Sequence, residues 1–240
     1  MLPDPACLAD RSGRWEKHCR RVIVDAILYV VDNGIKWRAL PADFPPWPTV
    51  YKRFTVWERA GATQRLLDAL RDRARLASGR TAAPSAAIID SQSVRAAPTV
   101  ATSTRGYDAG KKVQGRKRHI AVDTLGLLVA VLMTPASASD RIAARSLLRR
   151  LRSAAGRRVG LVCADGGYTG TLLAWVRTTL VLTVEIVKRP DLPHFTVLPW
   201  RWVVERTLAW ITHHRRCARD YERLHHHHEA IVRSLIRITV

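Results

Sequence analysis

The sequence predicts an α/β protein in which a mixed sheet flanked by helices follows a small all-helical N-terminal part. Apolar residues recur at helical spacing between residues 20 and 76, and segment 77–85 breaks that periodicity. From residue 86 onwards, short β-rich runs alternate with helical ones. We therefore expect a helical domain at 1–76, a linker at 77–85 and an α/β domain at 86–240.

Composition narrows the class of protein. The 240 residues include 40 Lys and Arg against 20 Asp and Glu, a net charge of +20, and 47% of them are hydrophobic. A basic chain with this apolar content should fold and bind a polyanion, most simply DNA, although a ribosomal or chromatin protein would share the charge. No leader pattern is evident and no apolar run reaches the ~20 residues of a membrane span, which favours a protein that is not exported.

The four cysteines, Cys7, Cys19, Cys163 and Cys217, have no metal-ligand spacing. We expect a reducing cytoplasm and no structural zinc. Cys163 stands in an apolar run, so it is predicted to be a small buried residue.

The N-terminal part has the pattern helix, turn, basic helix. Residues 20–31 are amphipathic, and Gly34 follows as a residue that tolerates a left-handed cap. A proline-rich turn leads to Thr49, which we expect to cap a second helix at 50–57. A third helix is expected at 64–76.

Lys52 and Arg53 lie beside aromatic residues on the expected second helix. In a helix-turn-helix arrangement they would contact DNA. The alternative is a small bundle that only packs on the main domain.

The second part has the order strand, strand, strand, helix, strand, which is the order of a ribonuclease-H-like fold. A further helix, strand and long Arg-rich helix complete the layer. The expected strands are 86–91, 119–123, 127–133, 159–164 and 181–187, and the expected helices are 141–154, 171–178 and 199–216.

Three acidic residues stand in distinctive local sequences. Asp90 ends the apolar run Ala-Ala-Ile-Ile-Asp, Asp165 follows an expected parallel strand, and Glu205 lies on the last long helix. Asp90 and Asp165 would project from the carboxyl edge of the sheet, where open α/β sheets place ligands. Convergent carboxylates of this kind hold the divalent ions that cleave or join phosphodiesters, so we predict a magnesium site.

Arg201 and Glu205 are four residues apart and share a helix face, so Arg201 could clamp a phosphate while Glu205 holds a metal. Taken alone, the pair is better interpreted as an ordinary intrahelical ion pair; the two aspartates favour catalysis. Asp123 and Asp140 are rival acids, but Asp123 is interpreted as part of a hairpin turn and Asp140 as part of a helix cap.

Segment 105–118 combines glycines with clustered cations and is interpreted as a flexible basic loop that contacts nucleic acid; the alternative is a solvated loop. The predicted contacts are Tyr107, Lys111, Lys112, Arg116, Lys117 and Arg118.

The run His225 to His228 is predicted to be solvated, because four consecutive helical residues point in four directions and cannot converge on one ion.

At these residues the chain resembles DDE transposases of bacterial insertion sequences of the IS-five group, from about Arg14 to the end. The segments that carry the resemblance are Asp90-Ser-Gln-Ser-Val, Gly106-Tyr-Asp-Ala-Gly-Lys-Lys, Gly115-Arg-Lys-Arg-His, Val122-Asp-Thr-Leu-Gly, Ala164-Asp-Gly-Gly-Tyr and Arg201-Trp-Val-Val-Glu-Arg-Thr, together with Trp37-Arg-Ala-Leu-Pro and Asp43-Phe-Pro-Pro-Trp.

The resemblance implies a ribonuclease-H-like core with Asp90, Asp165 and Glu205 as catalytic triad and metal ligands. It implies two Mg²⁺ ions, replaceable by Mn²⁺, cleavage of double-stranded DNA at element ends, and attack of the freed 3′-hydroxyl on target DNA. Cutting two ends together implies a homodimer or larger synaptic complex. The expected location is the bacterial cytoplasm, in association with the nucleoid.

Two departures from the family pattern accompany the match. Leu198 stands at the position of an expected tyrosine and Thr212 at that of an expected lysine, whose charge His213, Arg215 or Arg216 could supply. The N-terminus also looks short for the family. The alternatives to an active transposase are a non-catalytic DNA-binding derivative and a structure-selective nuclease.

Overall fold

The computed structural model describes residues 16–187 and 199–235. Its α-helices are α1 (Arg20–Asn33), α2 (Trp47–Arg59), α3 (Ala62–Ala77), α4 (Asp140–Ala155), α5 (Thr171–Trp175), α6 (Pro199–His213), α7 (Arg215–Ala218) and α8 (His225–Ser234). Its strands are β1 (Ala86–Arg95), β2 (Gly106–Asp108), β3 (Val113–Asp123), β4 (Leu128–Pro135), β5 (Leu161–Ala164) and β6 (Thr183–Ile186).

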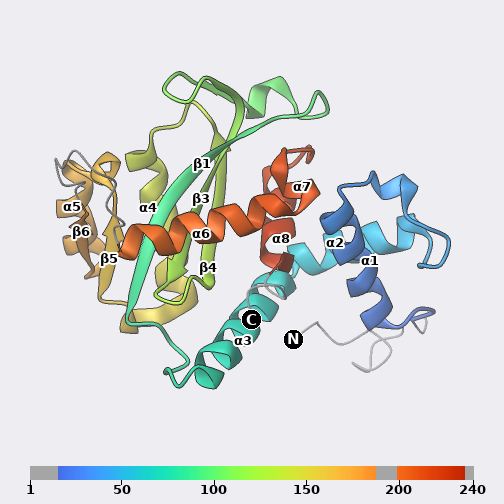
Figure 1. The fold of residues 1–240 in the computed structure, drawn as a ribbon, viewed down its shortest axis with the longest axis horizontal. Coiled ribbons are helices and arrows are strands. Elements are labelled where there is room, and N and C mark those ends of the chain that lie inside the picture. Colours follow the sequence, from blue (N-terminus) through green and yellow to red (C-terminus); the bar gives the residue numbers. More distant parts are fainter. Residues whose placement is uncertain (1–15, 188–198, 236–240) are drawn as a thin grey trace.

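The sheet is mixed. Its strand order is β2-β3-β1-β5-β6, and β4 also pairs with β3. The β1, β3 and β4 ladders are antiparallel, whereas β5 runs parallel to both β1 and β6. This is the ribonuclease-H-like mixed sheet that the sequence predicts, flanked by helices as expected (Figure 1).

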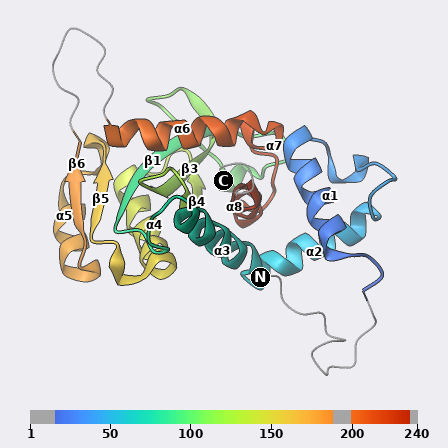
Figure 2. The same ribbon diagram turned by 60° about the horizontal axis from the view of Figure 1, so that its bottom comes forward.

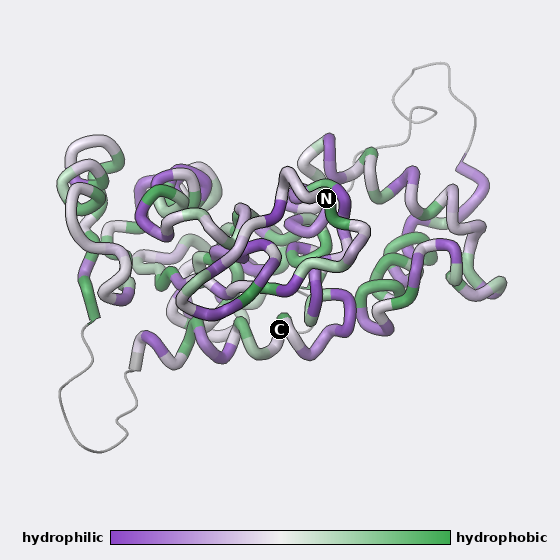
Figure 3. The backbone as a smooth tube through the Cα atoms, turned by 90° about the horizontal axis from the view of Figure 1, so that it is seen from above, coloured by the Kyte–Doolittle hydropathy of each residue, from purple (hydrophilic) through white to green (hydrophobic). Residues whose placement is uncertain are grey.

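Alternation along the strands divides the apolar core between the two faces of the sheet. Ala87 and Ile89 of β1 join one buried cluster with α4 and α5, whereas Ile88 joins a second cluster with α6 and α8. Helix α6 lies along this second face (Figure 1), and hydrophilic and hydrophobic residues alternate along it (Figure 3).

The N-terminal helices follow the predicted order. Gly34 caps α1 with φ of 68°, as expected of a glycine in the left-handed region. The cap predicted at Thr49 is wrong, because α2 begins at Trp47 directly after Pro46. Pro48 fits this first turn, where no intrahelical N–H bond is needed.

The core of the helical part is continuous with that of the sheet. Phe54 and Trp57 of α2 belong to the same buried cluster as Val204 of α6 and Ile231 of α8. Helix α8 lies between the sheet and the helices α1 and α2 (Figure 2), and it contacts α2, α3 and β4. A separately folding domain at 1–76 remains a proposal.

Among the described helices, none is long and apolar enough to cross a membrane.

Candidate active site

Strand register brings the two predicted aspartates together. In the parallel β1–β5 pair, Ala87 is opposite Val162 and Ile88 is opposite Cys163. Continuing that register by two residues places Asp90 beside Asp165. Because side chains alternate, Asp90 shares the face of Ile88, and Asp165 that of Cys163, so both aspartates face α6.

Asp90 lies within β1 rather than at its end, because pairing with β3 carries the strand on to Arg95. Its carboxylate accepts a hydrogen bond from the Ser91 N–H at 2.7 Å. Burial, with a further contribution from the charge of Asp165, raises the pKa of Asp90 to about 6; Lys111 and Arg201 oppose this shift. These charges respond to one another as parts of one site.

Asp165 is the first residue after β5 and caps the short 3₁₀ turn Gly166–Tyr168. Its Oδ1 accepts a hydrogen bond from the Gly167 N–H at 2.9 Å. A Cβ at Gly167 would lie only 3.1 Å from that oxygen, so the glycine leaves room for the carboxylate. The sequence Asp-Gly-Gly therefore fixes the orientation of the acid.

Helix α6 supplies Arg201 and Glu205. Arg201 Nε donates to Glu205 Oε1 at 2.7 Å. This hydrogen bond, followed by the charges of Glu205, Asp90 and Asp165, raises the pKa of Arg201. Arg201 also lines the hollow above the aspartates, whereas the half-exposed Glu205 does not. Asp90, Asp165 and Arg201 therefore line one hollow, and Glu205 is connected to it through its ion pair with Arg201.

The hollow has a volume of about 10 Å³ and is lined by Asp90, Asp165, Trp200 and Arg201 with apolar neighbours. It has room for about one water-sized species. Two adjacent carboxylates offer the hard oxygen ligands that Mg²⁺ prefers, and a cation there would relieve the repulsion that raises the pKa of Asp90. The donor set fits a hard divalent ion.

Sequence reasoning did not identify Tyr168 as a buried neighbour of the aspartate pair. Its side chain is 1% exposed, and burial, followed by the charges of Asp90, Asp140 and Asp165, raises its pKa. Its buried hydroxyl lies near Ser91, and the interaction with that side chain opposes part of the rise in pKa. The signal was present in Asp-Gly-Gly-Tyr, where a tyrosine follows the acid within one turn.

Neither rival acid joins the aspartate pair. Asp123 is fully buried, forms an ion pair with Arg75 and accepts hydrogen bonds from the N–H groups of Leu125 and Leu127, so it organises the β3–β4 turn. Asp140 begins α4 and pairs with Lys117 at 3.3 Å.

Two family models cover most of the chain. One described as "Transposase DDE domain" matches residues 81–239, and one described as "Putative transposase of IS4/5 family" matches residues 1–67. The chain belongs to the DDE transposase family. The second match begins ahead of Arg14, where the resemblance was expected to begin.

A curated relative is the "Putative transposase for insertion sequence element IS402" of Burkholderia cepacia, 33% identical over 115 residues, or 45% of this chain. The chain spans about half the length of that relative, 54%. Among solved structures, the "Crystal structure of the Mos1 Strand Transfer Complex" is 12% identical and aligns 89% of this chain with 83% of that one at a TM-score of 0.29. The family assignment of the transposase rests on the sequence models.

Three of the DNA contacts predicted for this chain are buried. Segment 105–118 is not a flexible loop: it forms β2 and the start of β3. Arg116 and Arg118 are 0% exposed and Lys117 is 6% exposed. Burial argues against the prediction that these three bind DNA: Arg116 and Lys117 form ion pairs inside the protein, and Arg118 donates hydrogen bonds to neighbouring groups there.

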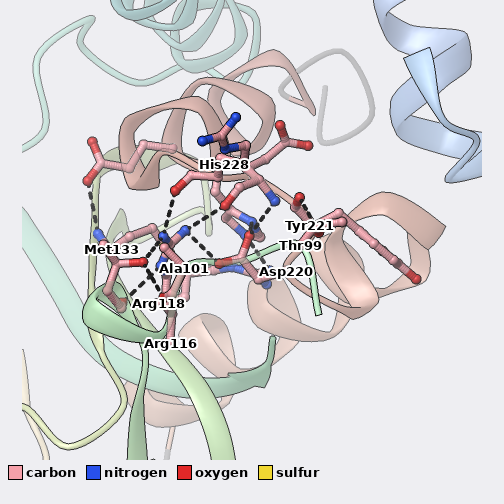
Figure 4. A network of polar contacts seen from close by, with 12 residues as sticks. Thr99, Ala101, Arg116, Arg118, Met133, Asp220, Tyr221 and His228 are labelled. Atoms are coloured by element: carbon pink, nitrogen blue, oxygen red, sulfur yellow. Dashed lines mark hydrogen bonds and ion pairs between the residues drawn. The ribbon is translucent and has the colours of Figure 1, made fainter. Parts of the chain in front are cut away.

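The partners of these cations lie far along the chain (Figure 4). Arg116 Nη1 donates to Asp220 Oδ2 at 2.9 Å, and Arg118 Nη2 donates to the Cys217 carbonyl at 2.7 Å. Asp220 also pairs with His228 Nδ1 at 3.0 Å. This network fastens β3 to the segment between α7 and α8.

The other predicted contacts remain on the surface. Tyr107 is 53% exposed, and Lys111 and Lys112 are exposed in the β2–β3 turn. Lys111 Nζ donates to the Ser91 carbonyl at 3.1 Å, one residue beyond Asp90. On α2, Lys52 is exposed, whereas Arg53 pairs with Glu16 at 3.1 Å.

The departures from the family pattern have different settings. Leu198 lies outside the described residues. The Thr212 hydroxyl donates to the carbonyls of Leu208 and Ala209 within its own helix. Of the proposed substitutes for the lysine charge, His213 and Arg215 are exposed. Arg216 cannot supply that charge to DNA, because it is buried and paired with Glu222 at 2.6 Å.

The histidine run is only partly solvated. His225 is exposed and His226 partly so, but His227 and His228 are 4% and 1% exposed. The prediction of a wholly solvated run is wrong, because α8 is sandwiched between the sheet and the N-terminal helices. Cys163 is buried, as predicted.

Proposed function

We propose that this chain is an active transposase that binds the ends of an insertion sequence, cleaves DNA there and joins the freed 3′-hydroxyl to target DNA. The observation that carries the proposal is the β1–β5 register, which continues to a side-by-side Asp90 and Asp165 facing Arg201. Family membership is consistent with this chemistry.

Cleavage and joining are the same displacement at phosphorus. In cleavage a water oxygen bonds to the phosphorus, the P–O3′ bond breaks and the leaving 3′ oxygen takes up a proton. In joining, the freed 3′-hydroxyl loses its proton and its oxygen bonds to a target phosphorus, while the target P–O3′ bond breaks and the leaving target 3′ oxygen takes up a proton. Two Mg²⁺ ions, for which Mn²⁺ substitutes, would lower the pKa of the attacking hydroxyl and stabilise charge on the phosphate.

The residues would divide this work. Asp90 and Asp165 would hold the ions, and Arg201 would hold the phosphate through its planar guanidinium. In the absence of DNA, Arg201 donates to Glu205 at 2.7 Å. A phosphate that bound Arg201 in place of Glu205 would free this glutamate to act as a further metal ligand. Both groups therefore change partners when DNA binds.

Exposed cations would guide the DNA. Lys111, which contacts β1 next to Asp90, and its neighbour Lys112 are suited to the DNA strand being cut, with Tyr107 available for stacking. Lys52 and Arg53 are proposed to contact DNA from α2. Bringing two ends together requires at least a homodimer, which light scattering on the complex with end DNA would detect as two chains or more.

The test uses labelled DNA carrying the terminal sequence of the element, with Mg²⁺ or Mn²⁺, and resolves products on a sequencing gel. We expect 3′-hydroxyl nicks and joined products from the wild type, and bound but uncut DNA from Asp165→Asn. Bound, uncut DNA with both proteins would instead identify a binding-only derivative. The ion pair between Arg201 and Glu205 is compatible with that alternative as well. Cleavage of branched DNA without end dependence or joining would identify a nuclease.

A further inference from the structure

Helices α2 and α8 bring together three side chains of the kind that bind transition metals. Glu58, His226 and His227 each offer a ligand atom, and these atoms all lie within 4.8 Å of one another. His226 Nε2 lies 3.9 Å from Glu58 Oε2. The cluster is distinct from the hollow above Asp90 and Asp165, since no residue of α2 or α8 lines that hollow.

Packing holds the cluster in place. Tyr51, Phe54 and Glu58 are spaced three and four residues apart and share one face of α2. The His227 ring lies edge-on to Tyr51 and Phe54, with centroid separations of 6.0 and 5.6 Å. Aromatic rings thus flank the donor atoms, fix the ring of His227 and exclude water from one side.

Adjacent residues can both contribute because the cluster sits in the first turn of α8. The rings of His226 and His227 are 4.7 Å apart and nearly perpendicular, at 86°. The His227 N–H bonds to the Leu224 carbonyl three residues back, as in a tightened turn. Glu58 approaches from the other helix, so the donors do not all come from one run.

We propose that Glu58, His226 and His227 form a binding site for a borderline transition-metal cation, Zn²⁺ above all, with a fourth position open to water. Two imidazoles and a carboxylate are a ligand set that Zn²⁺ accepts at about 2.0–2.2 Å. Such bonds place ligand atoms roughly 3.3–3.6 Å apart, so the side chains must close by about an ångström. The side chains of His226 and Glu58 are 37% and 12% exposed, which leaves an entry path.

A cation here would cross-link α2 to α8 and fasten the N-terminal helices to the C-terminal segment. Because it would bind the folded arrangement and not the separated helices, the ion would stabilise the fold. The site does not depend on the proposed DNA chemistry, and it would survive loss of that activity.

The experiment strips the full-length protein with chelator and titrates it with Zn²⁺ by calorimetry and by thermal unfolding. With Asp165→Asn in place to weaken cation binding at the aspartate pair, we expect one ion per chain and a rise in Tm of about 5–10 °C at a hundredfold excess over Kd. Co²⁺ should give the visible spectrum of a tetrahedral or five-coordinate site. Glu58→Gln and His226→Asn should each weaken binding by at least about tenfold.

Two matched variants test whether the ion binds at these three residues. His225→Asn removes an exposed histidine of the same run and should leave Zn²⁺ binding at the cluster unchanged. Comparison of the wild type with Asp165→Asn separates any cation that the aspartate pair holds. If His225→Asn loses binding as much as Glu58→Gln does, the histidine run alone attracts the ion and the proposal fails. Absence of any heat or Tm shift at millimolar Zn²⁺ would also overturn it.

Discussion

Burial shifts the pKa values of two ionisable side chains on neighbouring strands in opposite directions. It raises the pKa of Asp90 to about 6 and lowers that of His119 to about 4. In each case the neutral form of the side chain is favoured by its surroundings. Asp90 is charged at neutral pH at a cost that a bound cation would offset, whereas His119 stays neutral beside the Thr134 hydroxyl, 2.9 Å away.

His119 should make folding stability depend on pH. Its folded pKa is depressed below the ordinary 6.5, since burial outweighs the charge of Asp140, and Lys117 and Lys111 add to the effect. The contribution is complete above about pH 6.5 and is lost as pH falls toward 4. From about pH 7.5 to about pH 5, the wild type should lose about 2 kcal/mol more than His119→Gln.

Urea unfolding at the two pH values measures this difference, and His213→Gln, at an exposed histidine, serves as the control. The assignment fails if wild type and His119→Gln lose stability in parallel.

At the scale of elements, β3 is tied to the segment between α7 and α8 by charges that are out of contact with water. Arg116 and Asp220 are both 0% exposed. Breaking one side of such a pair leaves an uncompensated buried charge, which costs more than the pair itself contributes.

Asp220→Asn should therefore destabilise the protein by about 3–5 kcal/mol. The double variant Asp220→Asn with Arg116→Met should recover part of that loss, because the Arg116 charge is removed together with its carboxylate partner. Chemical denaturation of both variants checks this. A single variant as stable as the wild type would show that Arg116 finds other partners.

Elements could be predicted from the sequence because their signals are local. Short β-rich apolar runs indicate β1 and β4, helical periodicity indicates α1 and α3, and the apolar strand before each aspartate marks that acid. The burial of Arg116, Arg118 and His227 could not be predicted, since the residues and helices that contact and cover them lie far away in the sequence. A cluster of cations looks the same in sequence whether its charges are solvated by water or paired with a distant carboxylate such as Asp220.

At the scale of the molecule, only part of the positive charge behind the net +20 lies at the surface, where it can interact with DNA. Arg71, Arg75, Arg116, Lys117 and Arg118 are buried and cannot meet a phosphate backbone. In the proposed function the exposed cations near the aspartate pair, Lys111 and Lys112 foremost, would then interact with the DNA near the cut.

Replacing Lys111 and Lys112 by Ala should weaken binding of end DNA and reduce the salt dependence of log K by about 0.9 for each phosphate that the variant no longer neutralises. The matched control replaces Arg157 and Arg158, exposed cations ahead of β5 and so at the opposite edge of the sheet from Asp165. Fluorescence anisotropy at several salt concentrations measures both slopes. Equal slopes for the two double variants would locate the DNA elsewhere.

The most direct test of the central claim compares rates of DNA-end cleavage for Asp90→Asn, Asp165→Asn, Glu205→Gln and the rival Asp140→Asn, each first shown to be folded. The account predicts that the first three lose about a thousandfold or more, as expected when several kcal/mol of metal-dependent stabilisation is removed, while Asp140→Asn retains most of the rate. Wild-type cleavage by any of the first three variants would contradict the assignment of the site.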